Sequence, residues 1–187
     1  MITKLCYKLG TIEATNTLIK DLYLNLKDKV NKWSKITNQT PQARMGYVGQ
    51  HLVSVVTGYV GGKSGGRGYD LNINNNEYAE IKTCYRVDQL GKCKECGTAV
   101  SSLESYCSNC RSDNIERKDD SKWLITMKTD KDFSEILDPT FYYFVLFEFE
   151  DLNSINNKNI YVKIWRINPK NKGFAYAMID YYLNIRS

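Results

Sequence analysis

Apolar residues recur every three or four positions in the N-terminal part of the chain. From about residue 15 to residue 35 they form one stripe, with lysines on the other face: Leu18, Leu22, Leu26, Val30 and Trp33. This period is typical of an amphipathic helix whose apolar stripe packs on a core. The polar segment at 37–41 then ends the pattern. We therefore expect one helix here, with its lysines in solvent.

A second helix is predicted to begin at Thr40 and Pro41, which resemble an N-cap and a first-turn proline. It should run to about residue 57, with four apolar residues facing the core: Met45, Val48, Leu52 and Val55. Gly46 and Gly49 thin its other side, which also carries Arg44, Gln50 and His51. Two interpretations stay open. The glycines either allow close packing against a neighbour or leave room for a nucleic-acid backbone.

The rest of the chain alternates apolar strands with polar turns. Strands are expected at 69–73 and 77–84, joined by an asparagine-rich turn, and later at 123–127, 141–150 and 160–167. The last two strands should form a hairpin. A short helix is predicted at 130–138 and a final helix from about residue 173. These elements predict a single α/β domain of the α+β type, with room for a small inserted module.

Charge is unevenly distributed along the chain. The net charge is +5, and residues 1–70 carry 10 Lys and Arg against 4 Asp and Glu. A polyanionic partner would fit this surplus, although a solvated lysine-rich helix also explains it. No apolar run approaches the roughly 18 residues that span a bilayer, and no signal peptide opens the chain. We therefore expect a cytoplasmic protein, of a prokaryotic or phage host cell, with no membrane partner.

Four of the six cysteines form two Cys-x-x-Cys pairs at 93–96 and 107–110. The spacing C-x₂-C-x₁₀-C-x₂-C is typical of a structural zinc ribbon, in which four thiolates close a tetrahedral shell around Zn²⁺. The predicted ligands are Cys93, Cys96, Cys107 and Cys110. We expect this ribbon to be an insertion over 91–120 in a core made of 1–90 and 121–187. Cys6 and Cys84 are expected to be buried free thiols.

The role of the predicted ribbon stays open between two interpretations. It carries basic residues that could contact DNA: Lys92, Lys94, Arg111, Arg117 and Lys118. Against this, residues 91–122 carry 6 basic and 6 acidic residues, so the insertion is neutral overall. The alternative is that zinc only stabilises a long excursion from the core.

Three charged residues lie on the predicted hairpin at 69–84. Successive side chains on a strand alternate between faces, so Glu80 and Lys82 should project together while Ile81 points into the core. Asp70, on the preceding strand, can reach the same side. Two carboxylates suit Mg²⁺, with the Ile81 carbonyl as a third ligand. In phosphodiester cleavage, Lys82 would lie beside the water that attacks the scissile phosphate. A surface salt-bridged hairpin is the alternative explanation.

Other catalytic classes fit the sequence poorly. The chain has a single histidine, His51, whereas nucleases built on a ββα-metal motif and most zinc hydrolases need more. Gly-Lys-Ser at 62–64 suggests a phosphate-binding loop, but Thr57 stands where that motif requires its first glycine. The segment also follows a helix and not a strand, so we reject that interpretation.

The series Asp70, nine residues, Glu80-Ile81-Lys82 resembles the active-site motif of the PD-(D/E)XK nuclease superfamily, and within it type II restriction endonucleases. Tyr69 replaces the proline of the motif, at a position that the superfamily varies. Many such enzymes supply a glutamate from the preceding helix, where this chain has Gln50. A neutral amide is a weaker ligand, so Gln50 would orient water or phosphate.

The resemblance covers about residues 42–167 and implies a restriction-endonuclease-like core, with a mixed central sheet flanked by helices. It also implies Mg²⁺-dependent cleavage of double-stranded DNA that leaves 5′-phosphates, and a homodimer. Candidate DNA contacts are basic residues near the hairpin and on the ribbon: Arg44, Lys63, Arg67, Arg86, Lys92, Lys94 and Arg111. Two other functions stay open. One is a non-catalytic zinc-ribbon DNA-binding module, and the other is a repair or junction nuclease on the same core.

Overall fold

The computed structural model describes residues 10–39, 46–61, 69–85, 90–100, 104–117, 123, 125, 127–149 and 160–185. Several expectations fall outside these ranges. They include the helix start at Thr40 and Pro41, the Gly-Lys-Ser segment, Met45 and Cys6. Four candidate DNA contacts also lie outside the described residues: Arg44, Lys63, Arg67 and Arg86.

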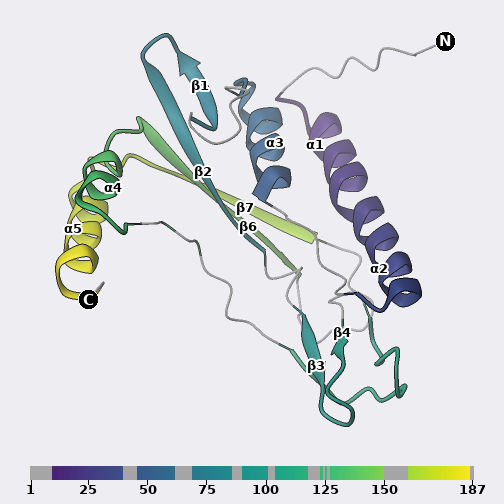
Figure 1. The fold of residues 1–187 in the computed structure, drawn as a ribbon. Helices are drawn as coiled ribbons and strands as arrows, with labels where there is room; N and C mark the ends of the chain where they lie inside the picture. The colour runs from purple at the N-terminus through teal and green to yellow at the C-terminus, as the bar shows by residue number, and fades with distance from the viewer. Residues whose placement is uncertain are drawn as a thin grey trace.

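The N-terminal helix is a continuous rod made of three segments (Figure 1): α1 (Ile12–Ile19), the π-helical η1 (Lys20–Leu24) and α2 (Asn25–Thr37). It begins at Thr11, whose Oγ1 accepts a hydrogen bond of 3.2 Å from the Ala14 N–H. It ends at Asn38, whose φ of 55° places it in the left-handed region. Helix α3 (Gly46–Thr57) lies beside this rod.

The predicted apolar stripe of the first helix is only partly confirmed, because Leu18 packs against the core but three other members are exposed. Leu22 and Leu26 are each 37 % exposed and Trp33 is 60 % exposed, whereas Tyr23 and Lys27 are buried. The buried face is shifted because Tyr23 stacks on Phe147 of the sheet, with ring centroids 6.2 Å apart. Lys27 lies one turn further on the same face and meets a distant carboxylate described below. The lysines are therefore not all solvent-exposed.

A four-stranded mixed sheet forms the centre of the molecule, in the order β1–β2–β6–β7. Its strands are β1 (Leu71–Asn74), β2 (Glu77–Tyr85), β6 (Phe141–Phe149) and β7 (Ile160–Ile167). β2 and β6 are parallel, while β1–β2 and β6–β7 are antiparallel. The two predicted hairpins are confirmed. The apolar run of β6 is buried from Tyr142 to Phe147, as expected for a central strand covered on both faces.

Helices cover both faces of the sheet, which confirms the predicted α+β fold class. On one face the rod and α3 pack over alternate strand residues such as Ile81, Tyr143 and Val145. On the other face, Tyr142 and Phe144 pack against residues of α4 (Asp130–Glu135) and α5 (Lys172–Asp180), which continues as η3 (Tyr181–Ile185). α4 is held at its start by a capping box between Thr129 and Asp132. The final helix is also confirmed.

The strand predicted at 123–127 is not formed at the described positions 123, 125 and 127. The Trp123 indole instead packs against the core, and its Nε1–H donates to the Val145 carbonyl at 3.0 Å. Its ring also meets the Phe144 ring edge-on, with centroids 5.6 Å apart. Large aromatic contacts thus replace the ladder hydrogen bonds that a strand would have made.

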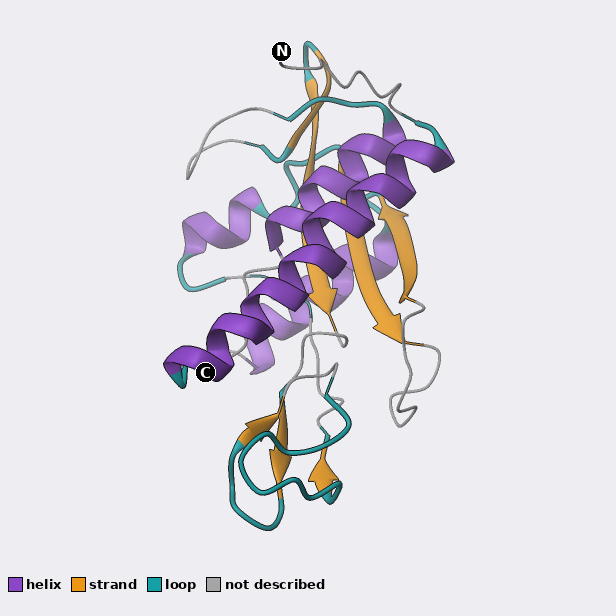
Figure 2. Ribbon diagram, turned by 90° about the vertical axis from the view of Figure 1, so that its right-hand side faces the viewer, coloured by secondary structure: helices purple, strands orange, loops and turns teal. Residues whose placement is uncertain are grey.

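The cysteine-rich segment forms a second, three-stranded antiparallel sheet in the order β4–β3–β5. Its strands are β3 (Gly91–Cys93), β4 (Ala99–Val100) and β5 (Ile115–Glu116). We call residues 90–117 the four-cysteine module; it has a small core of its own around Val100 and Ile115. Figure 2 shows this module beyond one end of the central sheet. Within the described ranges, every helix is too short or too polar to cross a bilayer.

Candidate active site and cysteine cluster

The β1–β2 hairpin brings the two predicted carboxylates to one place. Leu71 pairs with Ala79 and Asn72 with Tyr78, so the same register continued by one residue sets Asp70 opposite Glu80. The turn between the strands is closed by Asn74, whose side-chain oxygen accepts from the Asn76 N–H at 3.1 Å. Residues ten positions apart in the sequence thus become cross-strand neighbours.

Both oxygens of the Asp70 carboxylate accept hydrogen bonds. The Ile81 N–H donates to Asp70 Oδ2 at 2.7 Å, and the Gln50 side-chain amide donates to Asp70 Oδ1. Ile81 itself is 6 % exposed and points into the core, as predicted. The carboxylate is therefore held in one orientation by a strand and a helix at once.

Glu80 and Lys82 project from the same face of β2, as predicted. Lys82 Nζ lies 3.0 Å from Glu80 Oε2, and the two side chains are 28 % (Lys82) and 23 % (Glu80) exposed. The parallel register with β6 places Glu80 beside Tyr142 and Lys82 beside Phe144. The pair is thus partly sheltered by aromatic residues while its charged ends still reach solvent.

Burial raises the pKa of the Asp70 carboxyl above its ordinary value of 3.8. The Ile81 N–H opposes this effect, the negative charge of Glu80 adds to it, and the positive charge of Lys82 lowers it. A carboxylate whose charge is disfavoured by burial and by a second carboxylate is stabilised by any cation placed between them. The electrostatics of Asp70 and Glu80 therefore favour binding of a cation.

Gly49 explains how α3 comes close enough to place Gln50 at Asp70. A Cβ on Gly49 would lie 1.9 Å from Thr83 Oγ1, whereas a Cβ on Gly46 would meet nothing within 4 Å. For Gly49 the close-packing interpretation is confirmed, because β2 fills the space that the glycine leaves. His51, the next residue after Gln50, is exposed on the outer side of the helix.

The sequence reasoning missed two residues beside Glu80. The Tyr142 hydroxyl donates to the Ile136 carbonyl at 2.8 Å, and its pKa is raised by burial and then by the charges of Glu80 and Asp138. Asp138 stands before Pro139, directly ahead of β6. An acidic residue next to a strand start was the available signal, but only the parallel pairing of β2 with β6 brings it towards the site.

The four predicted cysteine ligands lie together. Their sulfur atoms all fall within 4.8 Å of one another, with Cys93 and Cys110 at 3.5 Å and Cys96 and Cys107 at 3.4 Å. Zinc–sulfur bonds of about 2.3 Å in a tetrahedron give sulfur separations of about 3.8 Å. The cluster can therefore hold a metal ion such as zinc. Hydrogen bonding to Thr98 lowers the pKa of the Cys96 thiol to about 5, whereas the contact with Cys93 raises the pKa of the Cys110 thiol.

Two equivalent turns, which we call the first and second knuckles, present these sulfurs. In the first, the Gly97 N–H donates to the Cys93 carbonyl at 2.9 Å; in the second, the Arg111 N–H donates to the Cys107 carbonyl at 2.8 Å. Gly97 has a φ of 74° and Arg111 a φ of 62°. The same left-handed backbone is thus made once by glycine and once by arginine, where a side chain is strained.

The remaining predicted residues do not gather at the hairpin. Lys92, Lys94 and Arg111 are exposed on the four-cysteine module, and Cys84 is buried in β2 as predicted. The Arg117 guanidinium donates to the Glu104 carbonyl at 2.6 Å within the module. Lys118 lies outside the described residues.

A nuclease is the class that fits a mixed sheet carrying two carboxylates and a lysine together with a cysteine cluster. Comparison with family models gives the same class and a particular family. The model for the MamI restriction endonuclease matches residues 32–187, which include the hairpin and all four cysteines. The chain belongs to the MamI restriction endonuclease family. No curated protein and no solved structure matches it. The prediction of a restriction endonuclease is confirmed by this match.

Proposed function

We propose that this protein is a type II restriction enzyme that uses Mg²⁺ to hydrolyse phosphodiester bonds in double-stranded DNA. The family match supports sequence-specific cleavage of DNA. One observation carries the chemistry: Asp70, fixed by Ile81 and Gln50, faces the Glu80–Lys82 pair across the hairpin. In this proposal the core belongs to the PD-(D/E)XK superfamily.

The residues at the hairpin fit a bound Mg²⁺. Carboxylate and carbonyl oxygens are the ligands it prefers, and it keeps several waters, so two carboxylates suffice. We assign the ligands as Asp70, Glu80 and the backbone carbonyl of Ile81. The raised pKa of Asp70 and its like-charged neighbour support this assignment, because both disfavour a site without a cation. When bound, Mg²⁺ supplies charge neutralisation at the scissile phosphate.

Lys82 is proposed to hold the attacking water and to stabilise the phosphorane. Its ammonium group has three N–H donors, and the contact with Glu80 uses one of them. The water oxygen forms a bond to phosphorus and its proton leaves to solvent, while the bond from phosphorus to the 3′ oxygen breaks and that oxygen takes a proton from a solvent water. The products are a 3′-hydroxyl and a 5′-phosphate. Gln50 acts as a positioning residue, because its amide contacts Asp70.

The four-cysteine module is proposed to be a zinc ribbon inserted over 91–120 into a core of 1–90 and 121–187. All four coordination positions would be filled by Cys93, Cys96, Cys107 and Cys110, so the zinc would be structural. We also propose that two copies of the chain form a homodimer, because one chain offers one hairpin site and a duplex has two strands to cut.

Digestion of plasmid and phage DNA with Mg²⁺ tests the proposal. Wild-type protein should give discrete fragments with 5′-phosphate ends, and Asp70→Ala and Lys82→Ala should each lower the rate by at least about 100-fold. Lys163→Ala is the matched control, because Lys163 also forms a strand ion pair, with Glu148 on β6. Intact DNA with the wild type would refute the enzyme and favour a binding module, whereas full activity in both variants would refute the hairpin as its active site.

A further inference from the structure

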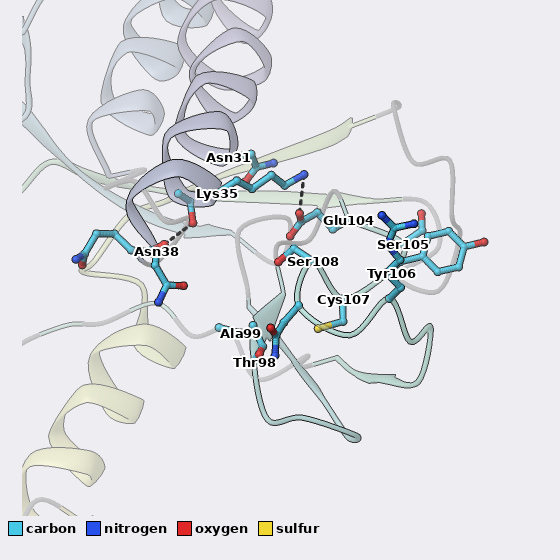
Figure 3. A pocket seen from close by; sticks show the side chains of 14 residues that line it. Asn31, Lys35, Asn38, Thr98, Ala99, Glu104, Ser105, Tyr106, Cys107 and Ser108 are labelled. Atoms are coloured by element: carbon cyan, nitrogen blue, oxygen red, sulfur yellow. Dashed lines mark hydrogen bonds and ion pairs between the residues drawn. The ribbon is translucent and has the colours of Figure 1, made fainter.

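A polar cleft separates the end of α2 from the four-cysteine module. Its volume is about 1190 Å³, and Figure 3 shows side chains from both sides entering it. The helix side contributes Lys35, Asn38 and Gln39, and the module side contributes Tyr106, Asn109 and Arg111. Amide, guanidinium and hydroxyl groups of this kind are the ones that proteins use to contact base edges.

Two residues with a left-handed backbone line this cleft. Asn38 and Arg111, with φ of 55° and 62°, are the two non-glycine residues in the described ranges that adopt a positive φ. Both line the cleft. Glycine would relieve both positions, as Gly97 does at the matching place in the first knuckle. Asn38 is an ordinary residue for the left-handed end of a helix, whereas at Arg111 a long side chain is kept against a conformational cost, which points to a use for it.

Glu104, the acidic residue in the wall of the cleft, does not neutralise the positive charge of Arg111. Glu104 lies in the wall, but its carboxylate contacts Lys35 Nζ at 3.0 Å and also faces the buried ammonium of Lys27. Within the described part of the chain, no carboxylate forms an ion pair with Arg111. Asn31 adds a buried side-chain oxygen for which no partner is found among the described residues. An occupant of this cleft would thus be polar, with acceptors for Arg111 and the amide N–H groups and a donor for the Asn31 oxygen.

We propose that the cleft is the site where the enzyme distinguishes DNA sequences, with Arg111 and Asn38 as specificity-determining residues. Arg pairs best with guanine O6 and N7, and Asn with adenine N6 and N7. This inference rests on the proposed nuclease function and adds the place where the target is chosen. β2 continues for five residues from Glu80 to its end at Tyr85, a span of roughly 16 Å, and the module follows further along the chain. The contacted bases should therefore lie away from the scissile phosphate along the duplex.

Selection from a pool of random DNA duplexes, followed by sequencing, tests the proposal with the full zinc-loaded protein in Ca²⁺. The wild type should enrich one motif. Arg111→Gly and Asn38→Gly relieve the backbone, so both variants should fold and retain zinc. Each should lose discrimination by roughly 10- to 100-fold at one or more base pairs of that motif. Lys170→Ala is the control, because it removes an exposed charge outside the cleft, in the turn before α5.

The outcomes separate the cleft from the catalytic proposal. If both glycine variants enrich the wild-type motif with wild-type discrimination, or if Lys170→Ala changes the motif as they do, the cleft does not choose the sequence. If the wild type enriches no motif but cuts DNA, the cleft proposal fails and the nuclease stands. If the wild type enriches a motif that the glycine variants lose, yet cuts no DNA with Mg²⁺, the cleft stands and the proposed function fails.

Discussion

The hairpin site and the cysteine cluster are built by opposite means. The cluster takes all its ligands from residues 93–110, and two local turns position them. The hairpin site takes Asp70 from the start of β1, Glu80 and Lys82 from β2, and Gln50 from α3. The first site depends on spacing along the chain, whereas the second depends on how closely a helix packs on a sheet. Each should therefore fail under a different kind of mutation.

Loss of a cysteine ligand should have the largest effect and should leave the hairpin intact. In Cys107→Ser we expect loss of the zinc and unfolding of the four-cysteine module, since binding energies of roughly 10 kcal/mol hold small zinc modules. Metal analysis together with amide hydrogen exchange checks this. Exchange should become fast in β3 and stay slow in β2 and β6.

Cys84→Ser serves as the control, because Cys84 is a buried thiol of the central sheet. Fast exchange throughout the Cys107→Ser variant would show that the two regions fold as one unit and that their separation is wrong.

The buried Lys27 should make stability depend on pH at the junction between the regions. Burial lowers its pKa from 10.5 to about 8, opposed by the charge of Glu104. Between these two values the unfolded chain binds the proton and the folded chain does not, so the free energy of unfolding should rise with pH, by up to about 3 kcal/mol. Below pH 8 the full cost of the buried charge is present. Lys27→Met should lack this rise.

Urea unfolding of both proteins across the pH range between these two pKa values measures the difference. Other groups titrate alike in the two proteins, so their contributions cancel. Parallel curves would mean that Lys27 does not carry a buried charge.

Gly49→Ala should damage the hairpin site through packing. The added methyl group would overlap Thr83, forcing α3 away from β2 at a cost of about 2 kcal/mol and separating Gln50 from Asp70. The free energy of unfolding measured in urea and the rate of DNA cleavage should both fall, while the zinc content stays unchanged. Gly46→Ala is the matched control on the same helix, because its methyl group enters open space. Equal stability of the two variants would contradict the close contact.

Gln50→Leu should have the smallest effect. Loss of its hydrogen bond removes a donor to the charged form of Asp70, worth about 1 kcal/mol, and should raise the pKa of that carboxyl further. The acidic limb of the pH–cleavage profile should move to higher pH. His51→Ala, on the exposed side of α3, should leave the profile unchanged. An unmoved profile in Gln50→Leu would show that the amide does not position Asp70.

Local patterns predicted the parts of the molecule that local interactions build. Alternation and turn residues were enough for the β1–β2 hairpin, and cysteine spacing was enough for the cluster. The buried face of the first helix was not fully predicted, because burial of Lys27 depends on Glu104, which lies far away in the sequence. The strand at 123–127 failed because Trp123 gains more from the aromatic core than from a ladder.

The contact between Gln50 and Asp70 could not be predicted from either residue alone. Gly49 was the one indication of it in the sequence, but a glycine there has two interpretations. Only the position of Thr83 on the sheet shows that Gly49 serves close packing. The left-handed conformation of Arg111 was similarly hidden, because its sequence position gives no hint that the backbone there copies that of Gly97. The first feature depends on how segments that are far apart in the sequence pack together. The second depends on a backbone geometry that two turns of different sequence share.

The parallel pairing of β2 with β6 has a consequence for how this enzyme can change over generations. Parallel neighbours cannot be joined by a tight turn, so the chain must travel from one end of the sheet back to the other. The four-cysteine module occupies that obligatory return path. Insertions, deletions or whole replacements there leave the strand register of the central sheet untouched. With the roles proposed above for the cleft and the hairpin, target choice can diverge among descendants while the hairpin is inherited unaltered.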